Sequence, residues 1–251
     1  MGYKTDLTDA QWNLIKHHFK GSRKRKHEKR ILVNAVLYLN KTGCQWRMLP
    51  NDFPPHQTVH SFYRRARIKG LWKAIMDDLV KKSRVQAKRS ETPTYSIIDS
   101  QSVKTTYASE QRGIDGGKKV KGIKRSIVTD TEGNILNVKI NAANIHDTKS
   151  GEAVFQGALG KYPSIKGVSA DAGFRKTFEE AVRKLGKTVD IAIRTTKEWA
   201  ILPKRWIVER TFAWLTHSRR LSKDYEMTVD SSENMVIISH SATLLRRLTR
   251  L

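Results

Sequence analysis

Residues 95–99 read YSIID, a short apolar run that ends in an acid, and the segments around it decide the fold class. A short apolar run bounded by polar residues is typical of a buried strand. Two further β-type runs follow at 125–130 and 135–142. The residues between them, Thr-Glu-Gly-Asn at 131–134, are typical of a hairpin turn. We therefore expect three strands in succession, of which the last two form an antiparallel hairpin.

Beyond the hairpin, helical and strand-like segments alternate. We expect a helix at 151–159, a strand at 165–171, a helix at 178–185, a strand at 189–195 and a helix at 204–218. Such alternation indicates an α/β sheet. The order of the elements along the chain matches a ribonuclease-H-like fold. The predicted fold class is thus an α/β ribonuclease-H-like domain, preceded by a small all-α domain that resembles a helix-turn-helix module.

The all-α part is predicted from the first ninety residues. Thr8 and Gln11 have the spacing of a capping box, which indicates a helix N-terminus. Three more helices are expected at 29–41, 56–69 and 71–82. A polar stretch that ends in Pro93 separates these helices from the first strand, so we place a domain boundary there. The predicted domains are 1–90, a helical DNA-binding domain, and 91–251, a catalytic domain.

The chain is strongly basic. It has 48 Lys and Arg against 24 Asp and Glu, a formal net charge of +24. Residues 1–90 contain 21 basic and 6 acidic side chains, so the excess is concentrated in the helical part. An excess of this size favours a polyanionic partner, here double-stranded DNA. A helical bundle with a solvated basic face is the alternative interpretation.

The candidate DNA contacts are basic residues of both parts. They are Arg23, Arg25, Arg64, Arg65, Arg67, Lys119, Lys121, Lys124, Arg205, Arg219 and Arg220. The glycine-rich segment 113–122 is expected to be a mobile basic loop that can touch DNA. The single Cys44 excludes an internal disulfide and an all-Cys metal site. Because no apolar run approaches ~20 residues and no signal peptide is apparent, we expect a cytoplasmic protein with no membrane partner.

Three acids follow or lie near the predicted strand ends. Asp99 ends the first strand, Asp171 ends the fourth, and Glu209 lies near the start of the helix at 204–218. Carboxyl ends of neighbouring strands share one rim of a sheet, so folding is expected to bring these acids together. Converging carboxylates repel one another unless cations intervene, and Mg²⁺ or Mn²⁺ prefers such oxygen ligands. Taken singly, each acid is more often an ordinary surface or strand-end residue.

Several segments together resemble the DDE transposases of bacterial insertion sequences, most closely the insertion-sequence-five family. The resemblance covers nearly the whole chain. Its segments are 7–12, 44–50, 97–102, 121–130, 143–147, 170–174 and, most specifically, 205–215 (RWIVERTFAWL). Related transposases have a pattern of Tyr, two residues, Arg, three residues, Glu, six residues, Lys. Arg205 and Glu209 fit this pattern, whereas Leu202 and Thr216 depart from it.

The resemblance implies a transposase that cleaves phosphodiester bonds at element ends and joins the 3′-hydroxyl ends to target DNA. It implies that Asp99, Asp171 and Glu209 are the catalytic, metal-binding residues for two Mg²⁺ ions, with Mn²⁺ as a substitute. A homo-oligomer, a dimer in the synaptic complex, is the expected assembly. The alternatives are a DNA-binding regulator with an inactive core and a nuclease without strand transfer. The resemblance also implies a bacterial, nucleoid-associated location. We interpret His146-Asp147 as a turn or helix cap; the alternative is a pair that supports the metal ligands or binds metal itself. Residues 231–251 are interpreted as a closing core helix, with subunit contact as the second option.

Overall fold

The structure, a computed structural model, describes residues 2–19, 26–192 and 205–250. Its helices are α1 (Asp9–Ile15), α2 (Lys29–Thr42), α3 (His56–Ile68), α4 (Leu71–Gln86), α5 (Asp147–Lys161), α6 (Thr177–Lys184), α7 (Arg205–Thr216) and α8 (Val229–Leu248). Short 3-10 turns are η1 (Lys16–Phe19), η2 (Trp46–Met48), η3 (Ala172–Phe174) and η4 (Arg219–Leu221). The capping box of Thr8 and Gln11 is confirmed at the start of α1, with both reciprocal hydrogen bonds formed.

A six-stranded mixed sheet forms the centre of the second part. Its strands are β1 (Tyr95–Lys104), β2 (Gly113–Asp115), β3 (Val120–Thr129), β4 (Ile135–Ala142), β5 (Gly167–Ala170) and β6 (Thr188–Ile191). The order is β2-β3-β1-β5-β6, with β4 also paired to β3. Strands β1, β5 and β6 are parallel, whereas β3 is antiparallel to both β1 and β4. The predicted mixed α/β class with an antiparallel hairpin is confirmed.

The segment 113–122 differs from the expected mobile loop. It contributes β2 and the start of β3, which pair with each other from Gly113 opposite Gly122. Gly122 lies so close to β1 that an added Cβ would be 2.0 Å from the Val103 carbonyl oxygen. Glycine at this position therefore permits the close strand approach, and the glycine-rich composition marks tight pairing here.

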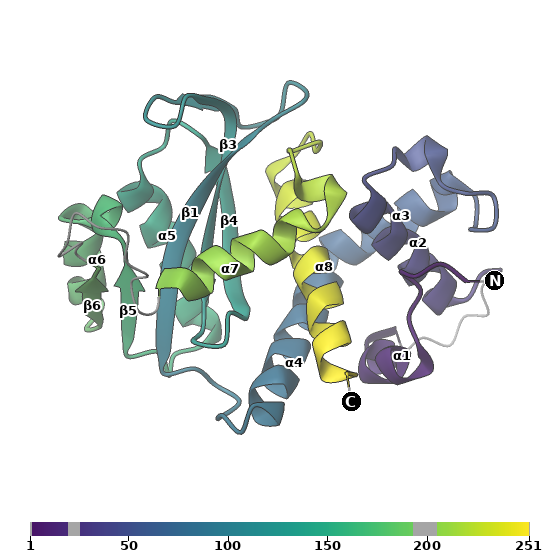
Figure 1. Ribbon diagram of the computed structural model, residues 1–251, viewed down its shortest axis with the longest axis horizontal. Coiled ribbons are helices and arrows are strands. Elements are labelled where there is room, and N and C mark those ends of the chain that lie inside the picture. Colours follow the sequence, from purple (N-terminus) through teal and green to yellow (C-terminus); the bar gives the residue numbers. More distant parts are fainter. Residues whose placement is uncertain (1, 20–25, 193–204, 251) are drawn as a thin grey trace.

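Helices cover both faces of the sheet. Figure 1 shows α7 crossing in front of β1, while α5 lies behind the strands. Consecutive strand residues point to opposite faces. Ser100 bonds to a residue of α5, so its neighbour Asp99 points toward the face that α7 covers. The sheet thus directs Asp99 to the side where α7 can supply further side chains.

The C-terminal helix α8 joins the two parts of the chain. It packs on β4 and also on α2 and α4 (Figure 1). The Asn40 amide donates to the Met235 carbonyl over 3.0 Å, and the Tyr63 and Ser231 hydroxyls are 2.8 Å apart. All side chains from Ser231 to Ser241 are buried, which confirms the predicted closing core helix. None of the described helices is long and apolar enough to cross a membrane.

Candidate active site

Asp99 and Asp171 lie at the same level of two neighbouring parallel strands. Ile97 of β1 is opposite Ser169 of β5, and two residues further along each chain are Asp99 and Asp171. Asp171 directly follows β5 and caps η3, where its carboxylate accepts the Gly173 N–H over 2.9 Å. Asp99 does not end its strand as predicted, because β1 continues to Lys104 in its pairing with β3. The structure nevertheless brings these two predicted site residues to one level at the end of β5, while their role as metal ligands stays a prediction.

The Asp99 carboxyl is held in surroundings that disfavour its charge. Burial, with the charge of Asp171 adding to it, raises the pKa of Asp99 from 3.8 to about 7. The Ser100 N–H, which donates to Asp99 Oδ1 over 2.7 Å, and the positive charges of Arg205 and Lys118 oppose this rise. A carboxyl with such a pKa binds a proton near neutral pH unless a cation compensates its charge.

Glu209 belongs to α7, which packs on β1. Val208, its neighbour in the helix, is fully buried, whereas the Glu209 side chain is 55% exposed and free to face the rim. Arg205 precedes it by one helical turn. Arg205 Nε is 3.0 Å from Glu209 Oε1, and the same guanidinium is 3.5 Å from Asp171 Oδ2. Arg205 therefore links the third predicted acid to the second.

This donor set suits a hard divalent cation. All three predicted ligands offer carboxylate oxygens, which Mg²⁺ and Mn²⁺ prefer. In the described ranges, the carboxylate oxygens of Asp99, Asp171 and Glu209 do not all lie within 4.8 Å of one another. The Arg205 guanidinium supplies positive charge between Asp171 and Glu209 instead. Burial and the charge of Asp171 keep the pKa of Asp99 raised although Arg205 opposes them, and a nearby cation would favour the ionised carboxylate.

Asp147 is a fourth acid at this rim, and it belongs to the His146-Asp147 pair that the sequence predicts to be a turn or helix cap. The cap interpretation of the His146-Asp147 pair is confirmed for His146, whose side chain accepts the Thr148 N–H at the start of α5. The Asp147 side chain instead points toward β1 and β3. Its Oδ1 accepts the Ser100 hydroxyl over 2.6 Å and pairs with Lys124 Nζ at 2.8 Å. The sequence signal for Asp147 was its position in the first turn of α5, the helix that follows β4.

The Asp147 network contacts the surroundings of both Asp99 and Asp171. Ser100, which it binds, is the residue whose N–H donates to Asp99. Asp147 and Asp171 both lie beside Gly173. A Cβ added to Gly173 would be 3.5 Å from Asp147 Oδ2 and 3.0 Å from Asp171 Oδ1. Asp147 is thus placed to hold the backbone around both acids rather than to add a separate site.

Five of the predicted DNA-contact residues are exposed side chains. They are Arg64, Arg65, Lys119, Lys121 and Arg219. Arg64 and Arg65 lie on α3, and Lys119 precedes β3. Arg23 and Arg25, with Leu202 of the family pattern, lie outside the described residues.

Three other predicted DNA-contact residues already have partners within the protein. Arg67 pairs with Asp230 at the start of α8, 3.3 Å away. Arg220 is buried, and its guanidinium is 2.6 Å from Glu226. Lys124 is buried against Asp147 as described above. These contacts hold the fold together, so the exposed arginines and lysines are the stronger candidates for DNA contact.

Comparison with known proteins identifies relatives over most of the chain. Residues 7–76 match a family described as "Putative transposase of IS4/5 family", and residues 91–244 match the family "Transposase DDE domain". A Burkholderia cepacia protein named "Putative transposase for insertion sequence element IS402" is 34% identical over 122 residues. That match spans 43% of this chain and 56% of the relative, so this chain covers little more than half of the relative's length.

A solved structure with some likeness is the crystal structure of the Mos1 mariner paired end complex with Mn. Its sequence is 11% identical, and the match covers 91% of this chain and 79% of that chain. The TM-score of 0.32 is too low to bear on the fold.

The DDE-domain match, from residue 91 to 244, covers more than half of the chain and includes Asp99, Asp171 and Glu209. The match over 7–76 covers most of the helical part that precedes it. By these matches, the chain belongs to the DDE transposases of insertion sequences.

Proposed function

We propose that this protein binds the ends of an insertion sequence, cleaves phosphodiester bonds there and joins the 3′-hydroxyl ends to target DNA. The observation that carries the proposal is the level placement of Asp99 and Asp171 on parallel strands, beside the Arg205–Glu209 pair of α7. An all-carboxylate rim in a chain of charge +24 suits metal-dependent chemistry on a polyanion.

The domain roles belong to the same proposal. The strand order, with three parallel strands and an antiparallel hairpin, supports a ribonuclease-H-like catalytic domain at 91–251. The helices of residues 1–90 are proposed to bind double-stranded DNA. A dimer in the synaptic complex and a cytoplasmic, nucleoid-associated location complete the proposal.

Asp99, Asp171 and Glu209 would hold two divalent cations, Mg²⁺ or Mn²⁺. Such ions, ~3.5–4 Å apart, activate an attacking oxygen and stabilise a leaving oxygen in phosphodiester chemistry. The chain's own residues bind and orient: the sheet fixes Asp99 and Asp171, and α7 presents Glu209 on an exposed face. Arg205 stabilises the acids before DNA binds, and a DNA phosphate is a further partner for its guanidinium.

Supplying cut ends tests this function against a plain nuclease. A duplex with a recessed or blunt element end, incubated with the full chain, plasmid target and Mg²⁺, should give end–plasmid joints. A nuclease without strand transfer would give only shortened or nicked DNA, and an inactive regulator would give only bound complexes. Either of these outcomes would contradict the joining activity.

Asp147→Asn is expected to lower joining by about 10–100-fold, the usual effect of losing a group that orients metal ligands. The amide keeps the size of the side chain but removes the charge that pairs with Lys124. Joining should be measured against Mg²⁺ concentration, because a positioning defect raises the Mg²⁺ needed for half-maximal rate.

Glu152→Gln is the matched control for this variant. It makes the same chemical change on the same helix, where Glu152 bonds to Gln156 away from the rim. Equal rates and equal Mg²⁺ requirements for Asp147→Asn and Glu152→Gln would contradict a positioning role for Asp147.

Arg64→Ala or Arg65→Ala is expected to relax discrimination between element ends and random DNA by about 1–3 kcal/mol per lost base contact. Both side chains are exposed on α3, and Arg can bind guanine through two hydrogen bonds. The measurement is competitive binding of end and scrambled duplexes at one salt concentration. Lys119→Ala, a phosphate-contact control, should weaken binding to both duplexes equally. If the arginine variants also weaken both equally, α3 does not read sequence.

A further inference from the structure

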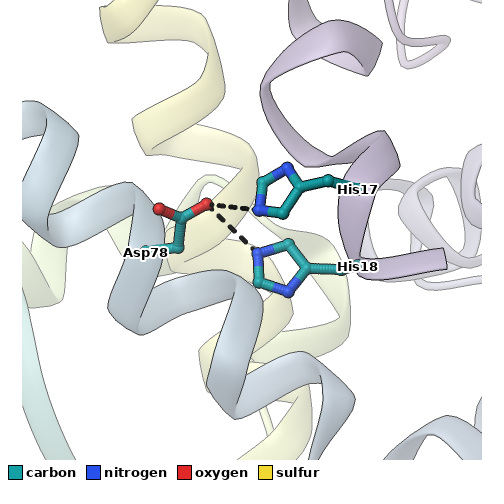
Figure 2. A group of neighbouring side chains, drawn as sticks. All are labelled: His17, His18 and Asp78. Atoms are coloured by element: carbon teal, nitrogen blue, oxygen red, sulfur yellow. Dashed lines mark hydrogen bonds and ion pairs between the residues drawn. The ribbon is translucent and has the colours of Figure 1, made fainter. Parts of the chain in front are cut away.

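Two histidines and an aspartate meet between η1 and α4, remote in sequence from the carboxylate rim. Figure 2 shows the imidazoles of His17 and His18 pointing toward the carboxylate of Asp78. His17 Nε2 is 3.2 Å and His18 Nε2 is 3.1 Å from the same oxygen, Asp78 Oδ2. The ligand atoms of these three residues all lie within 4.8 Å of one another. In the part of the chain that the structure describes, no other group of three His, Cys, Asp or Glu residues meets this distance.

The backbone holds these side chains in a converging arrangement. His17 and His18 are consecutive in a 3-10 turn, and their ring centroids are 4.1 Å apart with the planes tilted by 39°. Asp78 lies on α4, whose opposite, apolar side, including Trp72 and Met76, is buried in the core. The His18 and Asp78 side chains are only 16% and 24% exposed, whereas His17 is 46% exposed. The cluster is therefore half-enclosed, with one open side at His17.

The distances match those between ligands of one small cation. Zinc takes histidine nitrogen at ~2.0–2.1 Å and carboxylate oxygen at ~2.0–2.2 Å. Two such ligands ~3.1–3.2 Å apart subtend about 100° at the ion, close to a tetrahedral angle. Lys82 bonds to the other oxygen of Asp78, Oδ1, so it leaves Oδ2 available on the histidine side.

We propose that His17, His18 and Asp78 form a binding site for a divalent transition-metal cation, with Zn²⁺ as the natural occupant. Two imidazole nitrogens and one carboxylate oxygen suit Zn²⁺, whereas Mg²⁺ prefers oxygen ligands throughout. The site is chemically distinct from the all-carboxylate rim. A bound ion would join η1 to α4, and α4 is one of the helices on which α8 packs. The site thus adds a metal link between the start of the chain and its core.

Zinc titration of the full chain by calorimetry tests the site directly. The wild-type protein should bind one Zn²⁺ per chain at this site, and excess Mg²⁺ should not displace it. His17→Gln, His18→Gln and Asp78→Asn should each weaken that binding by tenfold or more. Glutamine and asparagine keep hydrogen-bonding side chains of similar size, so these variants are suited to retain the fold.

Two control variants separate this site from other zinc ligands. His217→Gln removes an exposed histidine outside the cluster and should bind Zn²⁺ like the wild-type protein. Asp99→Asn alters the carboxylate rim, and it should keep the Zn²⁺ that excess Mg²⁺ does not displace. The visible absorption of bound Co²⁺ and the rise of Tm with Zn²⁺ should be lost in the same three cluster variants. Undetectable binding by the wild-type protein, or wild-type affinity in His17→Gln and His18→Gln, would overturn the proposal. The cluster would then be a carboxylate that accepts hydrogen bonds from two imidazoles.

Discussion

Asp171→Asn is expected to lower DNA cleavage and joining by about 10³-fold or more, and Asp99→Asn and Glu209→Gln should do the same. A cation that stabilises developing charge contributes several kcal/mol to the transition state, and each ~1.4 kcal/mol is tenfold in rate. An amide cannot replace a carboxylate in holding that cation. The measurement is joining of cut ends in Mg²⁺, with Glu179→Gln on α6 as the matched control. Near-normal joining by any of the three variants would remove that residue from the site.

The free energy of unfolding of Asp99→Asn distinguishes the loss of a cation site from the loss of the fold. Because the folded-state pKa of Asp99 is raised from 3.8 to about 7, the folded chain binds a proton that the unfolded chain releases. Stability is therefore lost as pH rises through this window, and the loss is complete above about pH 7. Asn cannot ionise, so Asp99→Asn should be more stable than the wild-type protein at pH 8 without metal. We expect the free energy of unfolding of Asp99→Asn to exceed that of the wild-type protein by about 2 kcal/mol. This is half of the difference that the shift of the Asp99 pKa would give at about 1.36 kcal/mol per pKa unit.

This stability difference is measured by urea unfolding in the presence of a chelator. It should vanish near pH 4, where the wild-type carboxyl is protonated in the folded state. An inactive Asp99→Asn protein that is less stable at pH 8 would indicate a structural rather than a metal-binding role.

The affinity of the full chain for DNA is expected to fall by roughly 10³–10⁵ between 50 and 200 mM salt. Each phosphate contact contributes about −0.9 to the slope of log affinity against log salt, and six to ten contacts give this range. A net charge of +24, concentrated in residues 1–90, supplies enough basic side chains for those contacts. Filter binding or fluorescence anisotropy over a salt series provides the slope.

The full chain is needed for this measurement because α8 packs on α2 and α4. A fragment of residues 1–90 would lose the contacts of Asn40 and Tyr63 with α8 and expose the apolar side chains that α8 covers. Lys119→Ala, the phosphate-contact variant, should reduce the slope by about one unit, and Asp99→Asn should leave it unchanged. Salt-independent binding would contradict an electrostatic DNA interface.

Local patterns predicted much of the fold. The Thr8–Gln11 capping box, the β-hairpin turn at 131–134 and the strand ending at Asp171 are each set by neighbouring residues, and the structure has each of them. Asp99 and Asp171 could be placed on one rim because a parallel register follows from the order of strands and helices.

Contacts between distant residues set the features that the sequence did not reveal. Gly122 pairs with Gly113 of β2 and also lies close to Val103 of β1, and composition alone does not encode either contact. The role of Asp147 depends on Lys124, which lies on another element. Likewise, His18 and Asp78 are 60 residues apart and meet only because η1 packs on α4.

The number of Mn²⁺ ions bound in the presence of cut-end DNA tests the central claim most directly. Electron paramagnetic resonance of Mn²⁺ should show about two ions per chain at the carboxylate rim, as phosphodiester chemistry with paired cations requires. A His17→Gln background removes the nitrogen-containing site from the count. In that background, the account predicts that Asp99→Asn and Asp171→Asn each lose this binding. An unchanged Mn²⁺ count in both variants would contradict it.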